Sequence, residues 1–221
     1  MPWTLIESAT EGDALLELYR KDGVFMIRAN GLELMNGFCH DSETSLGRLA
    51  AALAPRPEPR ILLGGLGLGY TVAALVEALG TAASITVAEL SAGVIGWFHR
   101  HVRPSVLPDI PTGMTIVQAD IVDLLETEHR HDLVVLDIDN GPEPLVTPKN
   151  GALYSVEGLR SLRRCLSVNG RALLWSGFES VAFVERAHQA GFRVRCEPFQ
   201  RIRADLSHYI YVLEKNGAAA H

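Results

Sequence analysis

The chain has 221 residues, of which 48% are hydrophobic, and its formal net charge at pH 7 is −6. This length and composition suit one α/β unit with a core on both faces of a sheet, and the acidic balance argues against a nucleic-acid substrate. Three widely spaced cysteines favour reduced thiols over a disulfide frame or a metal site, and no apolar run reaches the roughly 18 residues of a membrane span, so we expect a cytoplasmic protein.

The first forty residues differ from the rest because short apolar runs alternate with turn residues. The runs Ala14–Arg20, Val24–Arg28 and Leu32–Met35 predict antiparallel strands, the last two joined at the turn Asn30-Gly31. We expect residues 1–40 to form a small β-element that lies over the substrate mouth or pairs with a second subunit.

A helix is expected from Asp41 to Leu53, because Asp41-Ser42-Glu43-Thr44 precedes a run rich in alanine and leucine that three prolines end. Beyond it, strands and helices alternate. The expected strands are Ile61–Leu63, Ile85–Ala88, Thr115–Gln118, Leu133–Leu136 and Ala172–Trp175. The expected helices are Thr71–Leu79, Ala92–His101, Val122–Glu128, Ser155–Cys165 and Val181–Ala190.

This alternation predicts a doubly wound, mostly parallel sheet with helices on both faces and ligands at the carboxyl ends of the strands. Two further strands, Phe192–Glu197 and Tyr209–Glu214, have no helix between them. They must pair as a terminal antiparallel hairpin, which brings the sheet to seven strands. We expect residues 41–215 to form this cofactor-binding domain and residues 216–221 to be a disordered tail.

The stretch from Arg60 to Thr71 is the most informative about function, because an apolar strand is followed by a glycine-rich turn and then by a helix. The glycines are Gly64, Gly65, Gly67 and Gly69. Such a turn lets the backbone pass close under a nucleotide-like ligand. The second apolar strand, Ser84–Glu89, ends in an acid whose carboxylate can accept both hydroxyls of a ribose. The alternative is a βαβ unit with a glycine-rich turn and a surface glutamate.

Acids also follow the third and fourth strands. Asp120 stands where folds of this kind place an acid against an adenine amino group, although it can equally cap the helix that follows. We expect Leu90, Asp120 and Ile121 to complete the cofactor site. Asp137 and Asp139 follow the fourth strand, where a carboxylate can hold an ammonium group or take a proton. We favour Asp137 as the catalytic residue, with Asp139 and Asn140 either facing the substrate or shaping the turn.

Four stretches carry a recognisable pattern in order along the chain: Ser84–Val94, Gly141–Pro144, Leu153-Tyr154 and Arg164–Gly170. They resemble the spermidine synthases, which belong to the class I S-adenosylmethionine-dependent methyltransferase superfamily. The resemblance implies a class I methyltransferase-like Rossmann fold, S-adenosylmethionine or its decarboxylated form as cofactor, and a homodimer. It also implies that Tyr154 flanks the acceptor cavity.

The start of the expected first helix extends the resemblance. Asp41-Ser42-Glu43 falls where the family reads Tyr-His-Glu, and His40 precedes it. We therefore expect His40, Asp41 and Glu43 to lie near the acceptor, a small molecule that the resemblance implies to be an amine.

The departures from the family bear on the reaction. The glycine turn reads Leu66-Gly67-Leu68 where the family has an aspartate that helps to bind the decarboxylated cofactor. The fourth strand ends in Asp137-Ile138-Asp139-Asn140 instead of Asp-x-x-Asp, and Asp41 replaces a tyrosine. Methyl transfer to an amine or hydroxyl is therefore the leading hypothesis. Aminopropyl transfer, internal alkyl transfer that releases methylthioadenosine, and a noncatalytic nucleoside-binding protein are the alternatives.

Overall fold

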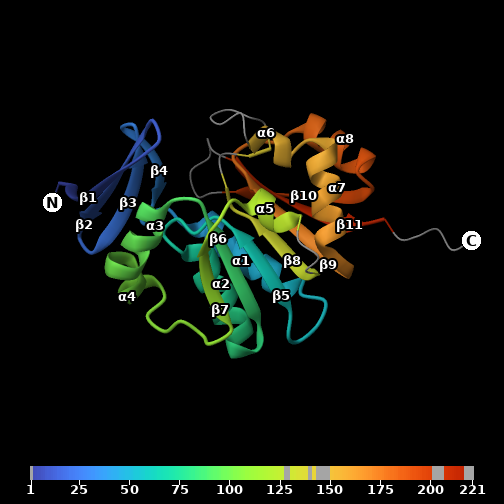
Figure 1. The fold of residues 1–221 in the computed structure, drawn as a ribbon, viewed down its shortest axis with the longest axis horizontal. Coiled ribbons are helices and arrows are strands. Elements are labelled where there is room, and N and C mark those ends of the chain that lie inside the picture. Colours follow the sequence, from blue (N-terminus) through green and yellow to red (C-terminus); the bar gives the residue numbers. More distant parts are fainter. Residues whose placement is uncertain (1, 127–129, 139–140, 143–149, 201–206, 217–221) are drawn as a thin grey trace, which may run out of the picture.

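A computed structural model describes residues 2–126, 130–138, 141–142, 150–200 and 207–216. Two sheets organise the chain, one of four strands and one of seven (Figure 1). The four-stranded sheet comes first in the sequence and lies at one side of the larger α/β unit. The expected α/β class, with its mostly parallel seven-stranded sheet, is confirmed.

The N-terminal sheet is an antiparallel meander of β1 (Thr4–Glu11), β2 (Ala14–Lys21), β3 (Val24–Ala29) and β4 (Leu32–Asn36). The turn at Asn30-Gly31 has φ of 49° and 79°, the left-handed conformation that tight hairpins need. Asp22-Gly23 forms a matching turn between β2 and β3. Strand β1 was not expected from the sequence, because its exposed residues show no apolar alternation.

The large sheet has the strand order β10-β11-β9-β8-β5-β6-β7. Its strands are β5 (Arg60–Gly64), β6 (Ser84–Glu89), β7 (Met114–Gln118), β8 (His131–Leu136), β9 (Leu166–Ser176), β10 (Phe192–Gln200) and β11 (Ser207–Lys215). Strands β5 to β9 run parallel, whereas β11 pairs antiparallel with both β9 and β10. The expected terminal hairpin is thus confirmed, and its order places the carboxyl ends of β5, β6 and β8 side by side.

Helices cover both faces of this sheet. They are α1 (Asp41–Ala52), α2 (Tyr70–Leu79), α3 (Ala92–Trp97), α4 (Arg103–Val106), α5 (Ile121–Leu125), α6 (Asn150–Leu153), α7 (Val156–Cys165) and α8 (Val181–Gln189), with a 3-10 turn at Gly80–Ala82. The helix expected over Ala92–His101 is correct only in its first half, because a π-helical turn at Phe98–Val102 follows α3. The helix expected over Val122–Glu128 is shorter, and residues 127–129 lie outside the described residues.

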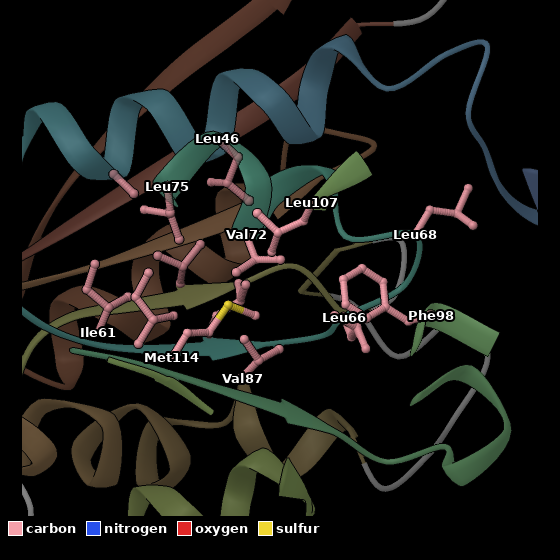
Figure 2. Packing of buried hydrophobic residues seen from close by; sticks show 14 of the residues in the cluster. Leu46, Ile61, Leu66, Leu68, Val72, Leu75, Val87, Phe98, Leu107 and Met114 are labelled. Atoms are coloured by element: carbon pink, nitrogen blue, oxygen red, sulfur yellow. The ribbon is translucent and has the colours of Figure 1, made fainter. Parts of the chain in front are cut away.

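Two buried clusters fill the two faces. One packs α1, α2 and α3 against Ile61, Leu63 and Val87, and it takes in the inner face of the N-terminal sheet. Leu66 and Leu68 of the glycine turn belong to this cluster together with Phe98 (Figure 2). The apolar residues of the turn are therefore part of the core. The second cluster packs α5, α7 and α8 against alternate residues of the same strands.

Two glutamates of β1 tie the N-terminal sheet to the segment after β6. Glu11 Oε1 accepts hydrogen bonds of 2.9 Å from Ser91 Oγ and from the backbone N–H of Gly93. Glu7 accepts hydrogen bonds from Arg100 and pairs with His101, and these two partners lower the pKa of Glu7 to about 2. Figure 1 shows the small sheet beside α3. These contacts fix the sheet next to the carboxyl ends of β5 and β6.

Candidate active site

The glycine turn takes its shape from close contacts within the protein. Gly65, Gly67 and Gly69 have φ of 92°, 49° and 83°. A Cβ added to Gly65 would lie 2.2 Å from the carbonyl oxygen of Asp137, and one added to Gly69 would lie 2.4 Å from the ring of Phe98. The turn thus needs glycine for its own packing as well as for any approach by a ligand. Gly64 ends β5, and a Cβ added to it would lie 3.1 Å from Ile121 at the start of α5.

Glu89 at the end of β6 joins two loops. Its Oε2 accepts a 2.9 Å hydrogen bond from the backbone N–H of Leu66, and its Oε1 accepts one of 2.9 Å from the N–H of Ser91. The side chain stays half-buried, and each carboxylate oxygen has a further lone pair for a ligand hydroxyl. Leu90 beside it is 67% exposed.

Asp120 follows β7, next to Glu89 across the sheet, since Ala119 N–H donates to the Glu89 carbonyl at 3.1 Å. Its Oδ1 accepts a 3.0 Å hydrogen bond from the N–H of Val122 and so caps α5. The structure therefore shows the capping role that the sequence suggested. The carboxylate is half-buried, and its second oxygen can accept a hydrogen bond from another partner. Ile121, in contrast, is buried in the second cluster.

Asp137 directly follows β8. Its backbone N–H donates to the Gly64 carbonyl at 2.9 Å, and its Oδ2 accepts a 2.5 Å hydrogen bond from Thr71 Oγ1. Burial and then the negative charge of Glu43 raise the pKa of Asp137 to about 7, and the Thr71 hydrogen bond partly opposes this rise. A carboxyl group with this pKa is half-ionised at neutral pH, the state in which it can exchange a proton with a bound molecule.

The first turn of α1 lies near Asp137 and Thr71. Glu43 Oε2 accepts a 2.5 Å hydrogen bond from Ser42 Oγ. His40 stacks on the ring of Tyr70, the first residue of α2, with the ring centroids 3.8 Å apart and the planes 4° from parallel. Burial and the charge of Glu43 raise the pKa of Tyr70. Asp41 is exposed in the first turn of α1.

Three residues near this site were not expected from the sequence: Met35, Tyr70 and Thr71. The sulfur of Met35 on β4 accepts a 2.9 Å hydrogen bond from the N–H of Leu68, and a Cβ on Gly67 would touch it at 2.4 Å. The N-terminal sheet thus contacts the glycine turn directly. A hydroxyl two residues after the last glycine was the available signal for Thr71, because the first turn of that helix adjoins the strand ends.

Tyr154 lies away from these contacts. It is 2% exposed, its ring stands edge-on to Phe183 with centroids 6.1 Å apart, and its carbonyl accepts a hydrogen bond from Arg186. These contacts belong to the second core cluster, so a role at the acceptor site stays a prediction. Asp139 and Asn140 lie outside the described residues.

A cavity of about 360 Å³ lies at the opposite ends of the strands. Its walls include Arg60, Leu62, Thr86, Thr115 and Arg130. Arg60 begins β5, whereas Gly64 ends it, so this cavity is separate from the site at the carboxyl ends. Within the described ranges, no group of three acidic, histidine or cysteine side chains is placed to hold a metal ion, and no helix is long and apolar enough to cross a membrane.

Solved structures share this fold. Spermidine synthase from Thermotoga maritima matches with a TM-score of 0.74 and 13% identity over 97% of this chain and 73% of its own. A spermidine synthase in complex with the transition-state analogue AdoDATO matches with a TM-score of 0.73, at the same identity and coverage. A probable spermidine synthase from Corynebacterium glutamicum matches with a TM-score of 0.68 and 15% identity, covering 95% and 79% of the two chains.

The chain therefore has a spermidine synthase-like form of the class I methyltransferase fold. Comparisons with protein-family models and with curated proteins found no match. The resemblance seen in the sequence is confirmed at the level of the fold.

Proposed function

We propose that this protein is a transferase that binds S-adenosylmethionine at the glycine turn and transfers a group from it to a small acceptor. The observation that carries the proposal is the convergence of Glu89, Asp120 and Asp137 at neighbouring strand ends around a glycine turn. Glu89 and Asp120 keep carboxylate oxygens for hydroxyl and amino donors, and Leu90 offers an apolar surface beside them. These features fit the ribose and the base of a nucleoside.

The glycine turn favours methyl transfer over aminopropyl transfer. Leu66 and Leu68 are buried in the core, and Gly67 lies against Met35. No side chain in this stretch can therefore supply the carboxylate with which the family holds the decarboxylated cofactor. Aminopropyl transfer, or alkyl transfer that releases methylthioadenosine, is the second candidate, supported by the likeness to spermidine synthases. A nucleoside-binding protein without activity is the third.

The acceptor side of the site favours an amine. The sulfonium cofactor would supply an activated carbon, so the protein must bind the acceptor, orient it and accept its proton. Glu43 and Asp137 place two carboxyl groups near one another, and the charge of Glu43 raises the cost of ionising Asp137 unless a cation lies beside them. A protonated amine would relieve this cost, and Asp137 would then take a proton from it.

The exposed apolar residues of the N-terminal sheet support a homodimer. Leu5, Ile6, Leu15, Leu32, Leu34 and Phe38 are large hydrophobic residues that lie exposed in or beside its strands. Such a concentration on one small sheet is typical of an interaction surface. We propose that a second copy of the chain covers it.

The proposed reaction can be tested by turnover. The protein is incubated with S-adenosylmethionine or with its decarboxylated form and a panel of amines, and the released nucleoside is measured. S-adenosylhomocysteine identifies methyl transfer, whereas methylthioadenosine identifies transfer or cyclisation of the longer arm. Asp137→Asn should lower turnover by roughly 10²- to 10⁴-fold, and the exposed control Glu185→Gln should not. Full activity of Asp137→Asn would remove Asp137 from the mechanism.

A further inference from the structure

We propose that Thr71 is a positioning residue whose hydroxyl holds the Asp137 carboxylate in one orientation and leaves Oδ1 as the oxygen that takes the acceptor's proton. The inference rests on the proposed function, in which Asp137 faces the acceptor. The geometry that carries it lies entirely within the protein.

The Thr71 hydroxyl has two acceptors within reach and one proton. Thr71 Oγ1 lies 2.5 Å from Asp137 Oδ2 and 3.3 Å from the backbone carbonyl oxygen of Glu43. The shorter contact is with the group that carries charge, and hydrogen bonds to charged acceptors are both shorter and stronger than neutral ones. The Thr71 hydroxyl therefore donates its hydrogen bond to Asp137, and Oδ2 is the oxygen that accepts it.

Thr71 has little freedom to turn away. It is 3% exposed, and it stands in the first turn of α2, directly after the glycine turn. On its other side, a Cβ added to Gly47 of α1 would lie 2.5 Å from the Thr71 carbonyl oxygen, so the two helices meet closely at this point. Threonine in a helix has two main χ1 rotamers, and the contacts with Asp137 and with the Glu43 carbonyl belong to the one observed here. The hydroxyl is therefore held in place between α1 and β8.

The charged group that acts on Asp137 from a neighbouring element is Glu43 on α1. Glu43 has its own hydroxyl donor, Ser42, and its charge also acts on the neighbouring Tyr70 of α2. Glu43 disfavours the ionised form of Asp137, whereas the Thr71 hydrogen bond favours it. Thr71 thus keeps part of Asp137 ionised and able to accept a proton near neutral pH.

The proposed step is the transfer of one proton from the bound acceptor to Asp137. The N–H bond of the bound ammonium breaks, its electron pair stays on nitrogen as the nucleophile, and the proton forms an O–H bond at Asp137 Oδ1. Asp137 becomes neutral. Thr71 keeps its own proton throughout, so it positions Asp137 and does not itself exchange a proton.

The test is a carbon-13 NMR titration of the aspartate carboxyl groups in the intact, ligand-free protein, with the Asp137 signal identified by its loss in Asp137→Asn. Thr71→Val removes the hydroxyl and keeps the shape, so the acid dissociation constant of Asp137 should fall about tenfold or more, as expected for the loss of a hydrogen bond to a charged group. Thr71→Ser keeps the hydroxyl and should leave this constant nearly unchanged. Glu43→Gln should raise it.

An unchanged dissociation constant in folded Thr71→Val would overturn the proposal. If Thr71→Val does not fold, Thr71→Ala carries the same expectation and the same contradicting result. Calorimetry with methylthioadenosine on the same samples separates this outcome from a failure of the proposed function. A tenfold shift without nucleoside binding would uphold the Thr71–Asp137 contact and reject the transferase, whereas binding without a shift would reject only the role of Thr71.

Discussion

Gly65 and Asp137 are in contact through their backbones, so closely that a Cβ on Gly65 would lie 2.2 Å from the Asp137 carbonyl oxygen. The contact joins the glycine turn to the end of β8, because Asp137 N–H also donates to the Gly64 carbonyl. The glycine turn, which we expect to bind the nucleoside, is thus in direct contact with the segment that carries the Asp137 carboxyl group.

This contact predicts a difference between two glycines that both have a positive φ. Gly65→Ala should lower the free energy of unfolding by roughly 3 kcal/mol or more, because the new methyl adds a steric clash to the strain of a positive φ. Gly80 has φ of 64° and ψ of −146° and nothing within 4 Å of an added Cβ, so Gly80→Ala should cost only its backbone strain, about 2 kcal/mol. Urea denaturation of the two variants measures the difference, and equal costs would contradict the close contact.

Asp137 should destabilise the folded protein above neutral pH. Its pKa is raised from 3.8 to about 7 on folding, so between these values the folded state binds more protons than the unfolded state. Stability due to this group is therefore highest below pH 4 and falls as the pH rises to about 7. Asp137→Asn should unfold with a free energy about 4 kcal/mol higher at pH 8, as about three pKa units at about 1.36 kcal/mol each imply, and nearly equal at pH 4.

Chemical denaturation of both proteins at the two pH values measures this effect. A variant less stable than the parent at pH 8 would show that Asp137 is not held in an environment that disfavours its charge. Together with lost turnover, the expected gain in stability would mark Asp137 as a residue kept for function at a cost in stability.

Glu11 should couple the N-terminal sheet to the site. It accepts hydrogen bonds from Ser91 Oγ and Gly93 N–H, while Ser91 N–H donates to Glu89. Glu11→Ala should therefore speed amide exchange in β1 and weaken nucleoside binding several-fold, with β8 unaffected. Glu7→Gln should have a smaller effect on the site, because the partners of Glu7 are Arg100 and His101, whereas Glu11 bonds Ser91, which in turn bonds Glu89. Hydrogen exchange read by mass spectrometry distinguishes them, and identical exchange in Glu11→Ala would reject the coupling.

The proposed dimer predicts that exposed leucines of β4 matter for association. Leu32 and Leu34 are 73% and 57% exposed. Light scattering should give twice the mass of one chain for the parent protein, and Leu32→Ser with Leu34→Ser should shift it toward the monomer. Val168→Ser, at an exposed position on β9, serves as the control. A monomeric parent at working concentration would reject the dimer and leave the fold unaffected.

The sequence predicted the residues whose placement follows from strand order alone. Glu89, Asp120 and Asp137 each follow a parallel strand, and the carboxyl ends of such strands meet at one edge. Thr71 was missed because its one local signal, a hydroxyl close after the glycine turn, does not identify its partner Asp137, and Tyr70 and Met35 were missed because their contacts join segments far apart in the chain. The core role of Leu66 and Leu68 was missed for the same reason.

The most direct test of the central claim is the affinity for the nucleoside. Calorimetry with S-adenosylmethionine, its decarboxylated form and methylthioadenosine should show binding of at least one of them by the parent protein. Glu89→Ala should weaken that binding roughly tenfold or more through the loss of two ribose hydrogen bonds, and Glu185→Gln should leave it unchanged. Absence of binding by all three ligands to the folded parent protein would contradict the proposed function.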